Sequence, residues 1–379
     1  MNFFRYPLGA ACLASGLASL VGPALASDWL DCATVTDNTE RLVCFDQKVR
    51  QFANPVELQS PPPVPYGPDL AAAAVAPAPV PSAVQRASAQ PSEITRFWDL
   101  EHAIARDNFE LRAYRPVALS LSGSTPVNRL PSSPAAGHTP AAEVNYQPGE
   151  LKINLSVRTK IMSGFLHSGS APLRDSLWFG YTQQSYWQLF NKDLSRPFRN
   201  TDHEPELVYV FPHFIALPSG WTYRMSAAGV VHQSNGQSLP LSRSWNRTYV
   251  MGAADKITDN GDRFTLQARV WRRMAEKAGQ DDNPDISDFV GRGELVGRWS
   301  FDTGTGTERT LHTLGLTARH ALRSTGRGSV RLEYLRSIGS ANSNGLRFHA
   351  QLFSGYGENL LDYNRNRTVA SVGLSLVDW

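Results

Sequence analysis

The sequence lacks a long apolar run after its first 26 residues. A helix needs roughly 20 apolar residues to cross a bilayer, and no later segment approaches that length. The mean hydropathy is −0.31. These absences argue against helical membrane spans in the mature chain. They leave a membrane β-barrel open, because its strands expose alternate residues to lipid and lumen and keep the average hydropathy low.

An excess of one charge is also missing. The chain carries 37 basic and 34 acidic residues, for a formal net charge of +3. A nucleic-acid-binding protein usually concentrates basic residues into a patch or stripe. We therefore expect no nucleic-acid partner.

Cysteine is scarce, with three residues in the whole chain. Cys12 lies in the expected signal peptide. Cys32 and Cys44 bracket a short amphipathic segment, which predicts a disulfide formed in an oxidising compartment. A free or metal-bound pair is the less favoured alternative, since no histidine lies nearby.

The first 26 residues have the pattern of a secretion signal. Arg5 precedes an apolar stretch over residues 8–21, and Ala24-Leu25-Ala26 forms a small-x-small cleavage pattern. We expect the mature chain to start near Ser27. Retention as an N-terminal anchor is disfavoured, because the segment is short and is interrupted by proline and glycine.

Composition then divides the remaining chain. Residues 27–52 form a small segment that includes Cys32 and Cys44, and residues 53–92 are rich in proline and alanine, which favours an extended linker. Residues 93–379 form the main domain. We expect the N-terminal segment and the linker to lie in the periplasm.

The main domain contains about twelve segments in which apolar and polar residues alternate, separated by turn-forming clusters. Leu151, Ile153, Leu155 and Val157, for example, share one face of a predicted strand. The sequence predicts an all-β fold, an antiparallel transmembrane β-barrel of about 12 strands. A soluble β-sandwich would give the same alternation. The predicted strands are 109–122, 150–162, 177–190, 206–214, 221–233, 245–255, 263–274, 294–302, 309–319, 329–338, 345–354 and 368–379.

The last predicted strand favours the barrel. It alternates through Ala370, Val372, Leu374 and Leu376 and stops on the aromatic Trp379. This ending resembles the terminal recognition strand of outer-membrane barrels. Because Trp379 is out of parity with the apolar positions, the strand must contain a bulge or shift of faces near its end.

Reactive side chains gather around residues 229–247. His232 and Ser234 are two apart on a predicted strand, so both project from one face, about 6 to 7 Å apart along the chain. An imidazole beside a hydroxyl can remove its proton and create a nucleophile. Gly236 permits a turn in which its N–H and that of Ser234 point at a developing oxyanion. Taken alone, a strand that ends in Ser-Asn-Gly is more often simply a turn.

A third residue completes the candidate set. Asn246 lies on the next predicted strand and falls opposite His232 if the hairpin closes symmetrically. Its amide oxygen would then accept the second imidazole N–H and fix the tautomer. Because an amide carries no charge, it stabilises the imidazolium less than an aspartate would.

These motifs closely resemble the signature of the outer-membrane phospholipase A family, a family of lipolytic barrels of about twelve strands. The resemblance covers most of the chain from about residue 100 onward. It is carried by His232-Gln233-Ser234-Asn235-Gly236, Ser242-Arg243-Ser244-Trp245-Asn246-Arg247, residues 181–189, Pro197-Phe198-Arg199, Glu204-Pro205, Asp282-Asn283-Pro284-Asp285, residues 354–358 and Asp362-Tyr363-Asn364.

The resemblance implies a calcium-dependent phospholipase of A1/A2 and lysophospholipase type in the outer membrane of a diderm bacterium, active on membrane phospholipids. It implies Ser234 as nucleophile, His232 as base and Asn246 as orienting residue, all on the lipid-facing wall. It also implies a homodimer that binds Ca²⁺. The implied ligands are the Ser242 side chain, the backbone carbonyl of Gln237, and Ser195 contributed by the second subunit.

Two further positions follow from the same resemblance. Gln183 matches a polar residue that contacts its counterpart across the dimer interface; the alternative is that it faces the lumen. Asp282 matches an acid that binds calcium in the inactive monomer, but its partner position holds Leu239, so that monomer site is expected to be weakened. From its context alone, Asp282 would cap a turn.

A non-catalytic barrel that serves as a pore or anchor is the alternative from a different class. A lipid A deacylase also places a His-x-Ser pair on a barrel wall, but the Asn246 and Asn-Pro-Asp motifs favour the phospholipase. We expect Arg199, Arg243 and Arg247 to be lumen or rim charges, and His203 and His213 to be rim or turn residues and not ligands.

Overall fold

A computed structural model describes residues 35–37, 40–41, 43–44, 91–167, 172–196, 198–306, 309–339 and 345–376. The chain divides into two compact units, Met1–Pro77 and Ala78–Trp379. The signal peptide, Cys32, nearly all of the linker and Trp379 lie outside the described residues. The predictions made for them, including the Cys32–Cys44 disulfide, therefore stay predictions.

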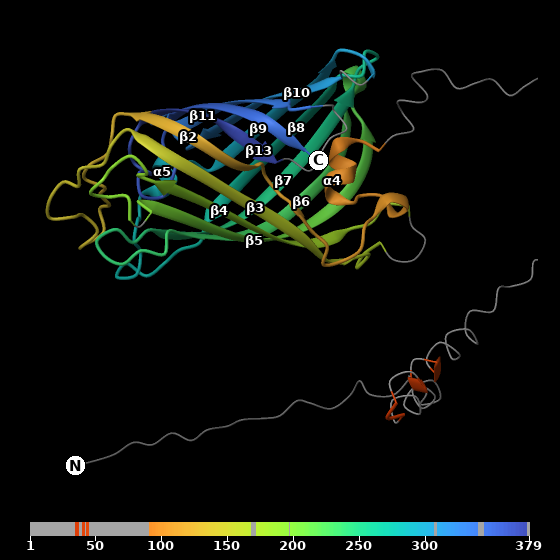
Figure 1. Cartoon of the computed structure of the whole chain (residues 1–379), viewed down its shortest axis with the longest axis horizontal. Coiled ribbons are helices and arrows are strands. Elements are labelled where there is room, and N and C mark those ends of the chain that lie inside the picture. The colour runs from red at the N-terminus through yellow and green to blue at the C-terminus, as the bar shows by residue number, and fades with distance from the viewer. Residues whose placement is uncertain are drawn as a thin grey trace, which may run out of the picture. The chain divides into compact units, whose positions relative to one another are not determined.

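The second unit is a closed antiparallel barrel (Figure 1). Its strands pair in chain order from β2 to β13, and β13 pairs back onto β2 to close the ring. This confirms the predicted barrel. The strands are β1 Leu111–Ala113, β2 Val117–Thr125, β3 Gly149–Ser163, β4 Ser176–Trp187, β5 Asn200–Ala216, β6 Thr222–Ser234, β7 Ser244–Ile257, β8 Arg263–Arg273, β9 Gly293–Thr303, β10 Thr310–His320, β11 Gly328–Ser337, β12 Leu346–Gly355 and β13 Arg367–Leu376.

The first predicted strand, 109–122, is in fact two strands. β1 pairs with residues 157–159 of β3 and β2 pairs with the first part of β3, so both follow the same edge of that strand. Pro116 lies in the gap between them and has no N–H to donate to the ladder. The predicted single strand was therefore wrong at this point, although both pieces have the same neighbour in the sheet.

Alternation along each strand separates two environments. Outward positions carry exposed apolar side chains, such as Leu119, which is 52% exposed, and Leu374, which is 49% exposed. Inward positions carry buried polar groups, including Lys152 and Lys160. An apolar outer band with a polar interior is the pattern of a membrane-spanning barrel. The band includes Leu121, Leu155, Val230, Val250, Leu295, Leu314, Leu332, Leu352 and Val372.

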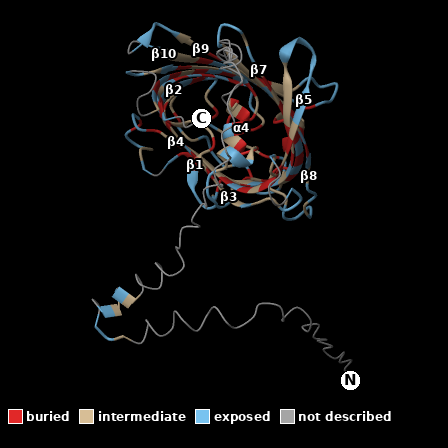
Figure 2. Cartoon of the chain, turned by 90° about the vertical axis from the view of Figure 1, so that its right-hand side faces the viewer, coloured by how far each residue is buried: buried red, intermediate tan, exposed pale blue. Residues whose placement is uncertain are grey.

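A short helix, α4 (Glu93–Trp98), lies inside the ring near one end (Figure 2). Ser92 caps its N-terminus by accepting a hydrogen bond from the Thr95 N–H at 3.2 Å. Trp98 packs edge-on against Trp178 of β4, with ring centroids 5.7 Å apart. The helix therefore fills part of the lumen. A second helix, α5 (Ile286–Phe289), lies in the loop between β8 and β9.

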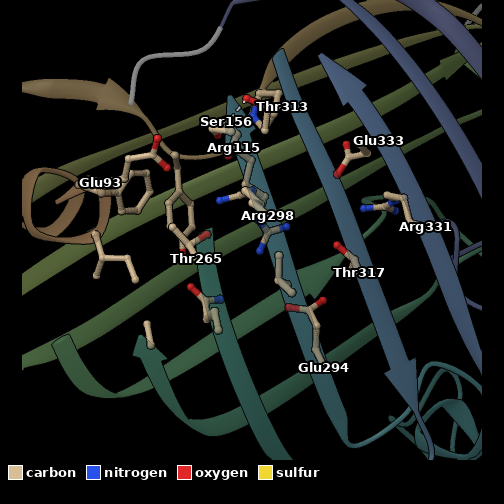
Figure 3. Close-up of a pocket in the computed structure, with 18 of the residues that line it drawn as sticks. Glu93, Arg115, Ser156, Thr265, Glu294, Arg298, Thr313, Thr317, Arg331 and Glu333 are labelled. Carbon is tan, nitrogen blue, oxygen red and sulfur yellow. Dashed lines mark hydrogen bonds between the residues drawn. The ribbon is translucent and has the colours of Figure 1, made fainter. Parts of the chain in front are cut away.

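Charged side chains occupy much of the remaining lumen. They surround a cavity of about 260 Å³, and Figure 3 shows Arg298, Arg331, Glu294 and Glu333 along its wall. Glu294 accepts from Arg319 Nε at 2.8 Å. The lumen is thus narrowed by α4 and by ion pairs, which does not favour a wide passive pore. None of the helices in the described part of the chain reaches the length and apolarity of a membrane span.

Asp99 anchors α4 to the barrel. Its carboxylate accepts from Arg112 Nη1 at 2.9 Å and from Lys160 Nζ at 2.8 Å, and all three side chains are buried. Burial by itself raises the pKa of Asp99, but the hydrogen bonds and charges of Arg112 and Lys160 outweigh it, so the pKa is lowered from its usual 3.8. The ionised carboxylate therefore stabilises the folded barrel.

Replacing this carboxylate should destabilise the barrel strongly. In Asp99→Asn, Arg112 and Lys160 stay buried without a counter-charge, and we expect a loss of about 3 to 5 kcal/mol in the free energy of unfolding. The wild-type contribution is present above the unfolded-state pKa of about 3.9 and is lost as the pH falls through the lower folded-state value. Denaturant unfolding of micelle-bound protein at several pH values measures both effects. Equal stability of variant and wild type at pH 7 would contradict this assignment.

Candidate active site

The candidate residues lie on the outer face of β6 and β7. Along β6, Val231 is buried toward the lumen, whereas Val230 and His232 are exposed on the other side. His232 and Ser234 share this parity, and Asn246 shares the outward parity of Val250 on β7. All three side chains therefore belong to the surface that carries the apolar band.

The β6–β7 ladder sets their spacing. His232 is paired directly with Asn246, and Ser234 is paired directly with Ser244. His232 Nδ1 and Asn246 Oδ1 are 2.9 Å apart. This hydrogen bond fits a ring whose Nδ1 carries the proton, which leaves Nε2 free to act as a base.

Ser234 ends β6 next to this pair. Among the described side chains, Ser234 and His232 make no hydrogen bond with each other, although they project from the same face. Without substrate, a catalytic hydrogen bond is often long and shortens only in the complex. Gly236 follows with a φ of 60°, in the left-handed region. Its N–H has no hydrogen-bond partner in the described part of the chain and is available to an oxyanion.

Asn235 holds the loop that follows Ser234. It is buried, and its Nδ2 donates to the Leu241 carbonyl at 2.8 Å while its Oδ1 accepts from the Arg243 N–H at 2.9 Å. The guanidinium of Arg243 is itself buried and donates to the carbonyls of Ser242 and His138. Asn235 and Arg243 thus fix the loop 235–243 from within, and the hydrogen bonds of the Arg243 guanidinium go to backbone carbonyls.

Asp282 gathers hydroxyl groups beside the site. Its Oδ2 accepts from Ser242 Oγ at 2.8 Å and from Ser244 Oγ at 3.1 Å, and its Oδ1 lies 3.0 Å from His138 Nε2. The group combines a carboxylate with neutral oxygens. The described residues contain no cluster of three or more His, Cys, Asp or Glu side chains suited to a metal ion. Any ion bound here would rely on hydroxyl and carbonyl oxygens as well.

Gln183 lies on the outer face of β4, opposite the exposed Leu155 of β3. Its Oε1 accepts from Tyr181 Oη at 3.1 Å, and its Nε2 donates to Ser185 Oγ at 3.2 Å. Its neighbour Gln184 lines the lumen cavity instead. The alternative that Gln183 faces the lumen is therefore wrong.

His203 was expected at a rim or turn, but it lies within β5, paired with Ser234 of β6 and with Gln183 of β4. Its Nδ1 is 2.7 Å from Tyr181 Oη. It thus continues the outward row that contains the candidate nucleophile. His213 also lies within β5, with Nε2 3.0 Å from Ser226 Oγ. The sequence did not reveal these positions, because they depend on which residues the β5–β6 register brings together.

The remaining predicted residues lie around the loops. Ser195 lies in the β4–β5 loop, where its carbonyl accepts from Trp187 Nε1 at 2.7 Å. Gln237 Nε2 donates to the Arg199 carbonyl at 3.0 Å. Leu239 is 61% exposed. Arg199 pairs with Glu150 and Asp362, and Arg247 pairs with Glu204 inside the barrel, so both arginines are lumen or rim charges as expected.

One residue near the site was not anticipated from the sequence. Glu276, in the loop after β8, accepts a hydrogen bond from Asn246 Nδ2 at 3.0 Å. No motif marks it, and thirty positions separate it from Asn246. The amide of Asn246 therefore has a partner on each side.

An outward histidine, serine and asparagine on a closed barrel are the groups expected of a membrane-embedded hydrolase. Comparison with known proteins agrees. The family model for phospholipase A1 matches residues 94–376. A putative phospholipase A1 of Neisseria meningitidis is 32% identical over 374 residues, covering 92% of this chain and 91% of the relative. Phospholipase A1 of Escherichia coli K12 is 34% identical over 235 residues, covering 62% of this chain and 72% of the relative.

Solved structures agree with the sequence matches. Outer membrane phospholipase A from Escherichia coli aligns with a TM-score of 0.57 and 31% identity, over 71% of this chain and 99% of that one. A Salmonella typhi outer membrane phospholipase dimer with bound calcium also has a TM-score of 0.57 and 31% identity, over 71% and 93% of the two chains. This chain belongs to the phospholipase A1 family of outer-membrane β-barrel enzymes.

The side-chain hydrogen bonds of Asn235 within the loop 235–243 give a prediction about stability. Asn235→Ala removes the acceptor of the Arg243 N–H and the donor to the Leu241 carbonyl in a buried setting, so we expect about 2 kcal/mol less unfolding free energy. Ser238→Ala, an exposed change in the same loop, should leave stability unchanged. Thermal or denaturant unfolding in micelles compares the two. A loss as large in Ser238→Ala as in Asn235→Ala would show that the loop, and not the amide, is responsible.

Proposed function

We propose that this chain hydrolyses the acyl esters of membrane phospholipids, as a phospholipase of A1/A2 and lysophospholipase type. The observation that carries the proposal is the hydrogen-bonded pair of His232 and Asn246 beside Ser234, on the outer wall of the barrel and within its apolar band. A lipid in the surrounding bilayer can reach such a site without leaving the membrane. The names of the relatives support the same substrate class.

The roles follow from the chemistry of the three groups. As Ser234 Oγ attacks the ester carbonyl, His232 Nε2 takes its proton and Asn246 Oδ1 stabilises the protonated ring through Nδ1–H. His232 then protonates the leaving alcohol as the ester C–O bond breaks. Water, deprotonated by His232, attacks the acyl-enzyme carbonyl, releasing the fatty acid and restoring Ser234. The N–H groups of Gly236 and Ser234 are the proposed oxyanion donors.

Calcium is the proposed cofactor, and the donor atoms suit it. Ser242 Oγ and the Asp282 carboxylate are adjacent oxygens, and the Gln237 carbonyl accepts no hydrogen bond from the described residues. Calcium prefers oxygen ligands of this kind. When bound, the ion would supply positive charge near the oxyanion and orient water. With the exposed apolar Leu239 in place of an acid, a separate monomer site at Asp282 would lack one carboxylate.

A homodimer is the proposed active form. Gln183 lies on the outer face, where its contacts with Tyr181 and Ser185 use one lone pair and one N–H of the amide and leave a second of each for another partner. A matching Gln183 from a second copy would bond this remaining N–H and lone pair. The same contact would bring Ser195 of the partner subunit toward the calcium ligands. The dimer described for the Salmonella typhi relative supports this arrangement.

Loop length supports an extracellular position for the site. The two longest loops, 126–148 and 274–292, are at the end of the barrel that carries the site, whereas the connections at the opposite end, apart from 164–175, are short. Outer-membrane barrels have long extracellular loops and short periplasmic turns. We therefore propose that the site lies near the outer leaflet and that the N-terminal segment is periplasmic.

Removing the nucleophile should abolish hydrolysis. We expect Ser234→Ala to lower kcat by at least about a thousandfold, because no acyl-enzyme can form. Wild-type Ser234 should react with a sulfonyl fluoride only when calcium is present, and a chelator should suppress both labelling and phospholipid hydrolysis. Mass spectrometry of the labelled peptide and fatty-acid release measure the two effects. Labelling that persists in Ser234→Ala would contradict the assigned nucleophile.

The dimer can be tested at Gln183. A cysteine placed there by Gln183→Cys should form an intersubunit disulfide when calcium and a non-hydrolysable phospholipid analogue are present, because the two copies of the residue would meet. Crosslinking yield on non-reducing gels is the measurement. A cysteine at Val372, on the outer face of β13, is a control that should not crosslink. Equal yields with and without calcium and analogue would remove the proposed link between activation and dimerisation.

A further inference from the structure

The amide of Asn246 is held from both sides. Its Oδ1 lies 2.9 Å from His232 Nδ1, and its Nδ2 donates to Glu276 Oε1 at 3.0 Å. The Glu276 side chain is only 17% exposed. His232, Asn246 and Glu276 thus form a continuous chain of hydrogen bonds on the outer wall.

A carboxylate at this place settles the orientation of the amide. The oxygen and nitrogen of an Asn side chain can exchange places by a half-turn, and the two orientations present opposite groups to a neighbour. An ionised carboxylate only accepts hydrogen bonds, so it selects the orientation in which Nδ2 points toward it. Oδ1 is then directed at His232, where it accepts the Nδ1–H and keeps Nε2 unprotonated and ready to act as a base.

Neighbouring contacts hold Glu276 in place. The Met274 N–H donates to the Asn246 carbonyl at 2.8 Å, which pins the start of the loop to the same residue whose side chain Glu276 contacts. Arg273 Nη2 lies 3.7 Å from Glu276 Oε2 and also pairs with Asp281, while its Nη1 donates to the Pro284 carbonyl at 3.0 Å. The carboxylate is therefore built into the loop.

We propose that Glu276 is a positioning residue for the hydrolysis reaction and acts on His232 through Asn246. The inference rests on the proposed function, in which His232 is the base. The negative charge of Glu276 polarises the amide and increases the negative partial charge on Oδ1. Asn246 is neutral, so it lacks the negative charge that an aspartate would place next to His232. Glu276 supplies that charge one hydrogen bond further from the imidazole.

The test compares the effect of Glu276→Gln on kcat in the wild-type enzyme with its effect in enzyme that carries Asn246→Asp. Glu276→Gln removes the charge and offers an amide that can bond Asn246 in either orientation, so in the wild-type enzyme kcat should fall about tenfold with KM unchanged. Asn246→Asp places a carboxylate directly against Glu276 and should be impaired by repulsion. In the N246D background, Glu276→Gln supplies a donor in place of the repelling charge, so its effect should disappear or reverse to a gain.

A role limited to loop structure predicts a different pattern. Glu276→Gln would then reduce kcat by the same factor in both backgrounds, and that result, or an unchanged kcat in the wild-type background, would overturn the proposal. Lys277→Gln is the matched control, because it changes one exposed charge in the same loop and should leave kcat unaltered. Thermal unfolding of each variant verifies that the barrel is intact.

The experiment also separates this inference from the proposed function. Full hydrolysis by Ser234→Ala would overturn the assigned reaction itself, whatever Glu276 does. An inactive Ser234→Ala together with an unaffected Glu276→Gln would overturn only the role of Glu276. An inactive Ser234→Ala with the background-dependent effect of Glu276→Gln would support both.

Discussion

The direct pairing of β6 with β7 is the constraint on which the site depends. One register brings His232 opposite Asn246 and Ser234 opposite Ser244. The same register directs Val231 and Trp245 into the core. Because side chains alternate along each strand, a single ladder determines both what faces the lumen and what faces the lipid. The candidate chemistry is therefore a property of the sheet and not of a flexible loop.

Alternation is also what made the fold predictable. Inward and outward residues repeat with a period of two from β2 to β13, apart from irregularities in β3, β5 and β6. The two-residue spacing of His232 and Ser234 on one strand is enough to place them on one face. The break at Pro116 was missed, because β1 and β2 follow one edge of β3 and look continuous in the sequence. Helix α4 was missed as well, since it is short and is held by Asp99 through residues of other elements.

Contacts between distant segments account for what the sequence did not reveal at the site. Arg243 reaches the His138 carbonyl, and Asp282 reaches Ser242 and Ser244. His203 joins the outward row only because β5 pairs with β6 in one particular register. Glu276 has no distinguishing neighbours in the chain. Local sequence patterns identify strands and side chains able to form hydrogen bonds. They do not show which loops come together at the end of the barrel that carries the site.

The barrel sheet has an apolar face toward lipid and a face of ion pairs toward the lumen, and this limits how the length of its strands can change. Inserting one residue into β6 between Val230 and His232 would turn the β6 residues beyond it to the opposite face, unless a bulge absorbed it as one does between Tyr223 and Met225. The imidazole and hydroxyl would then enter the lumen, and buried lumen residues would meet hydrocarbon. Natural variation in this hairpin should therefore consist of substitutions, of changes in loop 235–243, or of insertions and deletions in pairs.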